Sequence, residues 1–189
     1  MKKFLLLLLV LMIACSEQQE NADNNQDMAV ITQSNAGLSW QIPSDWIEEK
    51  PTSTMRAAQF RLPKAEADTE DANVVVFYFQ GEGGGVRANI QRWISQFKLP
   101  EGELTREVTE EAKTEVNGLT HTLVDIRGTY LFRPMPMAAN ATEKPGFRML
   151  AAVIEGGAGP WFVRFVGPEA TVAKWENSFR KFLGSFKQA

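Results

Sequence analysis

The stretch that decides the fold is NVVVFYF, residues 73–79, in which β-branched and aromatic side chains follow one another without interruption. Residues of these types favour β-strands. Alternate side chains of a strand point to opposite faces of the sheet, and in this stretch both faces are apolar. The sequence therefore predicts a central strand that other elements cover on both sides.

The segments on either side of this strand have different periodicities. Before it, GLSWQIP (37–43) alternates apolar and polar residues and stops at a proline, and MRAAQFRLP (55–63) predicts a second strand. After it, glycines at 83–85 break the strand, and a helical period begins at residue 86. One apolar stripe then predicts an amphipathic helix over 86–97, formed by Val86, Ile90, Trp93, Ile94 and Phe97.

The second half of the chain predicts a long hairpin, two more strands and a helix. Asn117-Gly118 is a two-residue turn signal, because a type I′ turn needs positive φ at both positions. In the outgoing strand, Val124, Ile126, Tyr130 and Phe132 share one face, and His121, Asp125 and Arg127 share the other, which we expect to be solvated. An irregular loop is expected at 133–146, strands at 147–155 and 160–167, and an aromatic-rich helix at 168–186.

Together these elements predict one α+β domain over residues 37–189, a mainly antiparallel sheet of about six to seven strands with amphipathic helices packed on it. The opening LSWQIPSDW (38–46) and this order of elements resemble the PsbP-like fold over residues 37–187, a layered sandwich. That group includes extrinsic photosystem proteins and many bacterial lipoproteins. The resemblance implies an accessory or binding protein. The photosystem-binding and metal-binding residues of the plant proteins have no match in this chain.

The first residues have the pattern of an export signal. Lys2 and Lys3 precede ten apolar residues, 4–13, a run too short for a membrane-spanning helix, which takes roughly 20 residues. We therefore predict a signal peptide over 1–14. LMIAC (11–15) resembles the lipobox of bacterial lipoproteins, which implies that Cys15, the only cysteine, is acylated and becomes the first mature residue. The alternative is an ordinary signal peptide with an incidental cysteine.

The next residues form a predicted tether. After Cys15, the segment up to residue 36 is rich in Gln, Asn, Glu and Asp and has no aromatic residue. Such a segment buries too little apolar surface to offset the entropy lost on ordering, so we expect a disordered polar tether over 15–36. Ser16 rather than Asp after the cysteine implies, by resemblance to Gram-negative lipoproteins, the periplasmic face of the outer membrane.

Composition excludes some classes of function. The formal net charge is −3 and falls further when Lys2 and Lys3 leave with the signal peptide. This balance argues against nucleic acid as a partner, since nucleic-acid binding needs a concentrated positive surface. His121 is the only histidine, so a zinc site of several His or Cys ligands is not expected. The acidic residues Glu107, Glu110, Glu111 and Glu115 lack calcium-loop spacing and predict an exposed charged strand.

Two loops are candidate binding segments. GEGGGVRAN (81–89) precedes a helix, and Arg87 with the backbone amides around Gly85 could bind an anion, but the loop lacks the Lys and Ser/Thr of a P-loop. A plain connection is the alternative. In FRPMPMAANATEKPG (132–146), Met135 and Met137 alternate with prolines beside Arg133. Methionines adapt well to binding surfaces; the alternative is that they cover the core.

From these observations we expect a membrane-anchored extracytoplasmic lipoprotein that acts as an accessory or binding protein. Its expected partners are the membrane, through the lipid anchor, and another envelope protein. We expect no enzyme activity, catalytic residue, metal or cofactor. The alternative function is a small-ligand carrier with a pocket between the sheet and helix 86–97, and an enzyme is a third possibility.

Overall fold

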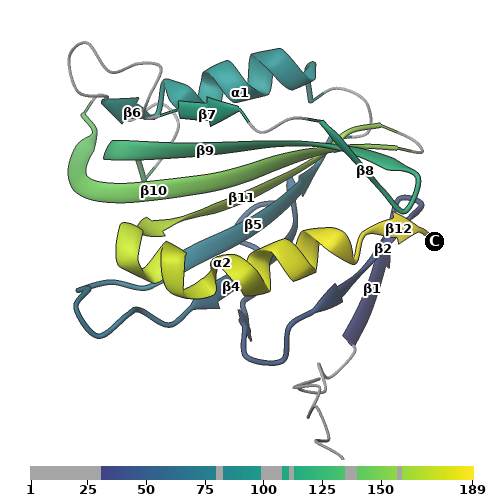
Figure 1. Ribbon diagram of the computed structural model, residues 1–189, viewed down its shortest axis with the longest axis horizontal. Coiled ribbons are helices and arrows are strands. Elements are labelled where there is room, and N and C mark those ends of the chain that lie inside the picture. The colour runs from purple at the N-terminus through teal and green to yellow at the C-terminus, as the bar shows by residue number, and fades with distance from the viewer. Residues whose placement is uncertain (1–30, 80–82, 99–107, 111–112, 135–139, 157–158) are drawn as a thin grey trace, which may run out of the picture.

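The computed structural model describes residues 31–79, 83–98, 108–110, 113–134, 140–156 and 159–189. In these residues the chain forms twelve strands and two helices, α1 (Val86–Ile94) and α2 (Glu169–Gly184) (Figure 1). The strands are β1 (Ile31–Asn35), β2 (Leu38–Ile42), β3 (Ile47–Glu48), β4 (Arg56–Leu62), β5 (Ala72–Tyr78), β6 (Phe97–Lys98), β7 (Val108–Glu110), β8 (Thr114–Val116), β9 (Leu119–Phe132), β10 (Thr142–Glu155), β11 (Trp161–Pro168) and β12 (Lys187–Gln188).

Among the described residues the strands form two antiparallel sheets. The larger has the order β3-β4-β5-β11-β10-β9-β6, and β7 and β8 also pair with β9. The smaller has the order β1-β2-β12, so that the first and last described strands share one sheet. The predicted α+β class with a mainly antiparallel sheet is confirmed. The expected count of six to seven strands was too low, because several strands of two or three residues are too short to show an alternating pattern.

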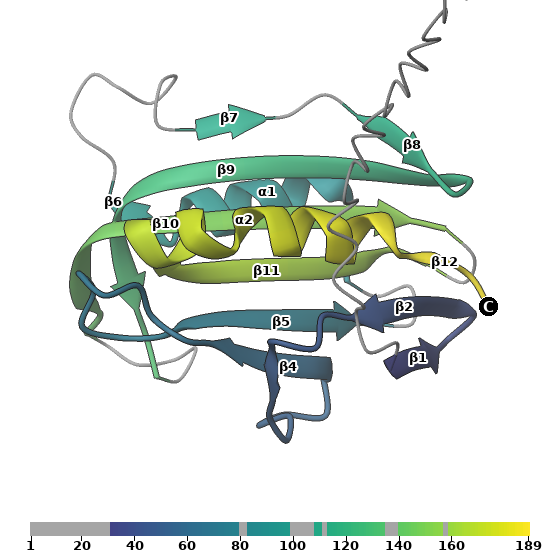
Figure 2. The same cartoon turned by 60° about the horizontal axis from the view of Figure 1, so that its bottom comes forward.

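The two helices cover opposite faces of the large sheet, as the two views show (Figures 1 and 2). Successive residues of β10 pack alternately: Leu150, Ala152 and Ile154 lie in the core cluster that contains α2. Met149, Ala151 and Val153 lie in the cluster that contains α1. The prediction that 73–79 is a covered central strand is confirmed, since Val74, Val75 and Val76 are at most 1% exposed.

The core beneath α2 is mainly aromatic. Trp40 stacks on Phe186 with ring centroids 5.2 Å apart and meets Trp161 edge-on at 5.3 Å. Aromatic pairs in these geometries contribute about 0.5–1.5 kcal/mol each beyond the burial of their area. Phe186, which follows α2, is therefore part of the core.

The predicted turn at Asn117-Gly118 is confirmed. Both residues have positive φ, 52° and 76°, and they join β8 to β9. The side-chain amide of Asn117 also donates hydrogen bonds to the carbonyls of Gly184 (3.0 Å) and Phe186 (2.9 Å) at the end of α2. The hairpin tip thus satisfies carbonyls that a helix end leaves without partners.

Three predicted boundaries were wrong. Residues 31–35 form β1 and pair with β2, although the tether was expected to extend to residue 36. The predicted loop 133–146 ends earlier, because β10 begins at Thr142. The helix expected over 86–97 ends at Ile94, and Phe97 belongs to β6, where it pairs with Tyr130. Phe97 is still buried beside α1, which explains why it fitted the helical stripe.

Candidate functional site

Of the four predicted binding residues, the structure describes only Arg87 and Arg133, and these two do not lie together. Cys15, Met135 and Met137 lie outside the described residues. Arg87 is exposed in the first turn of α1, and Arg133 is exposed just after β9. The end of β9 pairs with β6, which follows the other end of α1, so the two arginines lie toward opposite ends of that helix.

The glycines before α1 are held by packing. The side-chain amide of Asn89 donates to the carbonyls of Gly83 (2.8 Å) and Gly85 (3.1 Å). A Cβ on Gly83 would lie 2.5 Å from the ring of Phe162, so no larger residue fits there without a shift. These contacts favour a packed connection over an anion-binding loop.

The face of β9 that we expected to be solvated is instead covered by α2. His121 is 1% exposed and Asp125 is 7% exposed. Asp125 accepts two hydrogen bonds from Arg148, at 2.9 and 2.8 Å, and Arg148 also donates to Glu176 of α2 at 2.7 Å. The expectation was wrong because a polar strand face can be buried when its charges are paired.

Beneath α2, Arg148 is paired with Asp125 of the sheet and with Glu176 of the helix. Hydrogen bonds to Asp125 raise the pKa of Arg148; burial opposes this shift and the bond to Glu176 adds to it. Burial raises the pKa of Glu176, but the hydrogen bonds from Arg148 and Arg180 outweigh it and the pKa falls below its ordinary value. Such a paired network fixes α2 on the sheet and leaves little capacity for a ligand.

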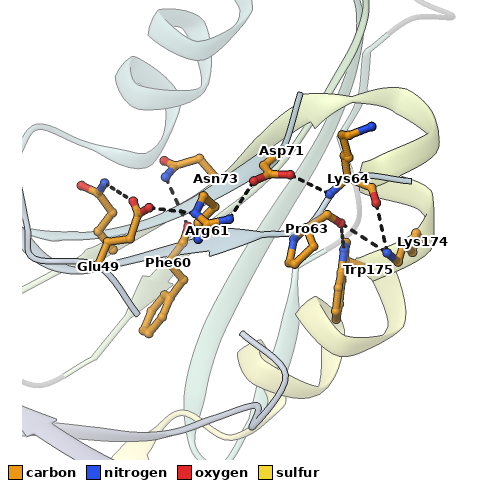
Figure 3. Close-up of polar contacts among 10 residues, drawn as sticks. Glu49, Phe60, Arg61, Pro63, Lys64, Asp71, Asn73, Lys174 and Trp175 are labelled. Carbon is orange, nitrogen blue, oxygen red and sulfur yellow. Dashed lines mark hydrogen bonds and ion pairs between the residues drawn. The ribbon is translucent and has the colours of Figure 1, made fainter. Parts of the chain in front are cut away.

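A second polar network lies at the edge of the sheet, around β4 (Figure 3). Arg61 donates to Glu49 at 3.1 Å and to Asp71 at 2.8 Å, and its hydrogen bond to Asp71 raises its pKa. The bond from Arg61 in turn lowers the pKa of Asp71. In the same view, Lys174 and Trp175 of α2 donate to the carbonyl of Pro63. In this network the carboxylates of Glu49 and Asp71 compensate the positive charge of Arg61.

In a third group no described carboxylate contacts the arginines, and we call it the Arg56–Arg164 cluster: Arg56, Gln59, Phe77, Gln96 and Arg164. Gln59 also donates to Glu49 of the second network at 2.9 Å. The guanidinium carbons of Arg56 and Arg164 lie 6.0 and 5.8 Å from the centroid of the Phe77 ring. Arg56 Nη1 donates to Gln59 Oε1 at 2.6 Å, and Arg164 Nη1 donates to Gln96 Oε1 at 2.9 Å. Both acceptors are neutral amides.

The elements explain why these residues meet. Arg56 of β4 pairs with Phe77 of β5, and Arg164 of β11 pairs with Val75, two residues from Phe77 on the same strand face. Gln96 lies in the turn that ends α1, so the helix brings an amide oxygen to Arg164. Sequence analysis missed the cluster because Arg56 and Arg164 belong to strands far apart in the chain.

The electrostatics of the cluster follow from two like charges near each other. Burial and the charge of Arg164 lower the pKa of Arg56, and Tyr130 opposes this shift. Arginine nevertheless stays protonated in proteins. The cluster therefore presents two partly exposed cations that can bind an anion, whereas the described residues of the cluster include no carboxylate, imidazole or thiol for acid–base or nucleophilic chemistry.

Two surface hollows lie near the candidate residues. One, of about 530 Å³, is lined by Asn35, Thr54, Met55, Arg56, Ala57, Tyr78 and Phe79, so it adjoins the cluster through Arg56. The other, of about 280 Å³, opens at the first turn of α1 and is lined by Gly85, Val86, Glu155, Gly156, Gly159 and Pro160.

Two further observations apply to the described residues only. No three of their His, Cys, Asp or Glu side chains are grouped so that they could hold a metal ion. Neither α1 nor α2 has the length and apolar character that crossing a bilayer requires.

Comparison with known proteins establishes the fold class. The chain is similar to the cyanobacterial PsbP protein CyanoP from Synechocystis sp. PCC 6803, with a TM-score of 0.51 at 13% identity over 88% of this chain and 96% of that one. The described domain therefore has a PsbP-like fold, as the sequence predicted. At this identity the similarity extends to the fold alone.

Other solved structures are less similar. A protein of unknown function from Pseudomonas aeruginosa has a TM-score of 0.44 at 12% identity and covers 82% of this chain and 94% of its own. A protein from Bacteroides thetaiotaomicron VPI-5482 has a TM-score of 0.40 at 11% identity, over 81% of this chain and 45% of its own. No family model matches the sequence, and no curated protein is significantly similar to it.

Proposed function

We propose that the chain is a membrane-anchored extracytoplasmic lipoprotein whose domain binds another envelope component and has no catalytic role. The observation that carries the binding part of the proposal is the Arg56–Arg164 cluster. Its two guanidinium groups are partly exposed and have only amide acceptors among the described residues, whereas the buried charges beneath α2 are paired. A surface with unused charge favours recognition of a partner of opposite charge.

The anchor part of the proposal rests on the sequence. A lone cysteine after LMIA, at the end of an apolar run and before a polar segment, fits lipid attachment at Cys15. Each buried methylene of an acyl chain contributes about 0.8 kcal/mol, so two or more chains hold a protein stably at a bilayer. The Ser that follows Cys15 supports placement at the periplasmic face of the outer membrane.

The alternative function, a small-ligand carrier, needs a pocket between the sheet and residues 86–97. Ile90, Trp93 and Phe97 are buried there against the sheet, in one cluster with Val124, Ile126, Met149 and Phe162. The nearby hollow of about 280 Å³ opens at the first turn of α1 and not beneath the helix. This packing favours the partner-binding function over the carrier.

Crosslinking in intact cells, followed by membrane fractionation, tests the proposal. We expect the parent chain in the outer-membrane fraction with a crosslinked envelope component. Cys15→Ala should move the folded chain into the soluble fraction, and Arg56→Gln/Arg164→Gln should keep the membrane location but lose the crosslink. Arg87→Gln, which changes an exposed arginine away from the cluster, is the control. A crosslink that persists in the double variant would contradict the binding surface, and unchanged fractionation of Cys15→Ala would contradict the anchor.

A further inference from the structure

The arginines of the described chain differ in how their charge is compensated. Among those that are buried or partly buried, Arg61, Arg127 and Arg148 each contact at least one carboxylate. Arg56 and Arg164 are also partly buried, but no described carboxylate contacts either of them. Removing a charge from water is costly unless an opposite charge or several hydrogen bonds compensate. The two arginines of the cluster therefore lack an opposite charge among the described residues and are available to bind an anion.

The donors in the cluster suit an oxyanion. Each guanidinium group has five N–H donors, and for Arg56 and Arg164 the described residues provide one acceptor each. Arg164 Nε is buried without a hydrogen-bond partner among the described residues. The planar fork of arginine matches carboxylate and phosphate oxygens.

One aromatic ring, that of Phe77, lies near both arginines. Phe77 is partly buried and stacks on Phe79 with ring centroids 6.0 Å apart. Both guanidinium groups lie over or beside the Phe77 ring. An apolar floor lowers the local dielectric constant and strengthens the attraction between an arginine and an anion.

The hollow next to Arg56 provides space for the rest of a ligand. Its volume of about 530 Å³ lies in the range of small-molecule sites, roughly 300–1,000 Å³. Its lining mixes polar side chains, such as Asn35 and Thr54, with the apolar and aromatic side chains of Met55 and Phe79. A ligand that placed its anionic group between the arginines could place a mixed polar and apolar body in this hollow.

We propose that the Arg56–Arg164 cluster binds the carboxylate or phosphate group of an organic anion, whose remaining part occupies the hollow lined by Asn35, Met55 and Phe79. This inference rests on the proposed binding function and names the chemistry of what is bound. The anionic group could belong to a soluble molecule or to a lipid headgroup, and the experiment below separates these sources.

The test titrates the full chain, purified in a detergent with an uncharged headgroup, with phenyl phosphate and with benzoate. The Nε–Hε NMR signals of the arginines are followed, so the parent chain alone already gives a result. We expect the signals of Arg56 and Arg164 to shift saturably while that of Arg61 does not, because Arg61 already has Glu49 and Asp71. Absence of saturable shifts in Arg56 and Arg164 with both probes would overturn the inference.

Matched variants localise the binding. Arg56→Gln and Arg164→Gln should each weaken affinity by about tenfold or more, the typical loss of a hydrogen bond to a charged group. Arg87→Gln, a charge change at an exposed arginine in the first turn of α1, should leave affinity unchanged. Arg164→Lys keeps the charge without the planar fork and should also bind more weakly, which covers the case of a poorly folded Gln variant. Equal loss in Arg87→Gln would show a nonspecific charge effect and overturn the site.

Vesicles distinguish the two sources of the anion. If cosedimentation with phosphatidylglycerol vesicles depends on Arg56 and Arg164 in the Cys15→Ala chain, the ligand is a lipid headgroup; if only the small probes bind, it is a soluble anion. Either result supports the site. Failure of the titration alongside Cys15-dependent fractionation and crosslinking would overturn this inference and leave the proposed function standing.

Discussion

His121 is a buried residue whose surroundings disfavour its charged form. Its side chain is 1% exposed, and Nε2 has no hydrogen-bond partner. It lies on β9 between Thr114 of β8 and Ile154 of β10. Burial lowers the pKa of His121, and the nearby Glu115 opposes this shift only in part. The folded protein therefore holds His121 in the neutral form at a pH where the unfolded chain already binds a proton.

This difference predicts a pH dependence of stability. Because the folded pKa lies below the ordinary value of about 6.5, the contribution of neutral His121 is complete above that pH and is lost as the pH falls toward the folded pKa. The free energy of unfolding should fall by up to about 1.4 kcal/mol per pH unit in this window. Urea denaturation between about pH 7.5 and about pH 5.5 measures it.

His121→Leu provides the control, since leucine fills a similar apolar space and does not titrate. The slope should disappear in this variant within the stated window. Glu176 also loses its stabilising effect on acidification, but that loss begins only near the ordinary carboxyl pKa of 4.5 and continues toward its lowered folded pKa, which is below the stated window. An equal slope in the parent and in His121→Leu would contradict the assignment of the effect to His121.

Individual residues also show what a single sequence can and cannot predict. Alternation along β9 correctly separated Val124 and Ile126 from His121 and Asp125, because the two-residue period of a strand is a local property. Whether the polar face is covered depends on α2, which lies much later in the chain. The same limit applies to Arg56 and Arg164: only the pairing of β4, β5 and β11 brings them to one ring.

Among the elements, α2 depends on a loop that is distant in sequence for its first turn. Pro168 precedes the helix and provides no side-chain cap. Instead, Asp68 accepts hydrogen bonds from the backbone N–H of Thr171 at 2.7 Å and from its hydroxyl at 2.5 Å. The Thr171 hydroxyl also accepts from the N–H of Ala65. A carboxylate at this position satisfies free N–H groups and interacts favourably with the helix dipole.

We therefore predict that Asp68→Ala destabilises the protein by about 1–2 kcal/mol, the usual loss on removing a helix cap. Thermal unfolding followed by circular dichroism measures the change. Glu66→Ala, an exposed acidic residue in the same loop, should have little effect. The account of α2 capping fails if the two variants have the same midpoint of unfolding.

Elements with a strong local signal were predictable, and short or polar ones were not. Asn117-Gly118 fixed the hairpin because its backbone requires positive φ, and Trp93 and Ile90 marked the buried side of α1. The strand β1, with the sequence ITQSN, resembles the polar tether before it, and pairing with β2 determines its structure. The capping by Asp68 had no signal in the sequence near α2.

In the whole molecule, the PsbP-like fold is formed by a sequence with 13% identity to CyanoP. One aromatic core lies under α2, and a smaller core lies under α1. The Arg56–Arg164 cluster lies on β4, β5 and β11 and contacts the end of α1 through Gln96. The described chain enters at β1 and leaves at β12, both in the small sheet, where they flank β2 (Figure 1). An anchor upstream of β1 would therefore join the domain at this sheet.

Mass spectrometry of the N-terminal peptide, taken from protein extracted from membranes, tests the account most directly. We expect Cys15 to be the first residue and to carry a diacylglyceryl group on its sulfur. A first residue other than Cys15, or an unmodified Cys15 within a longer peptide, would contradict the anchored binding protein that we propose.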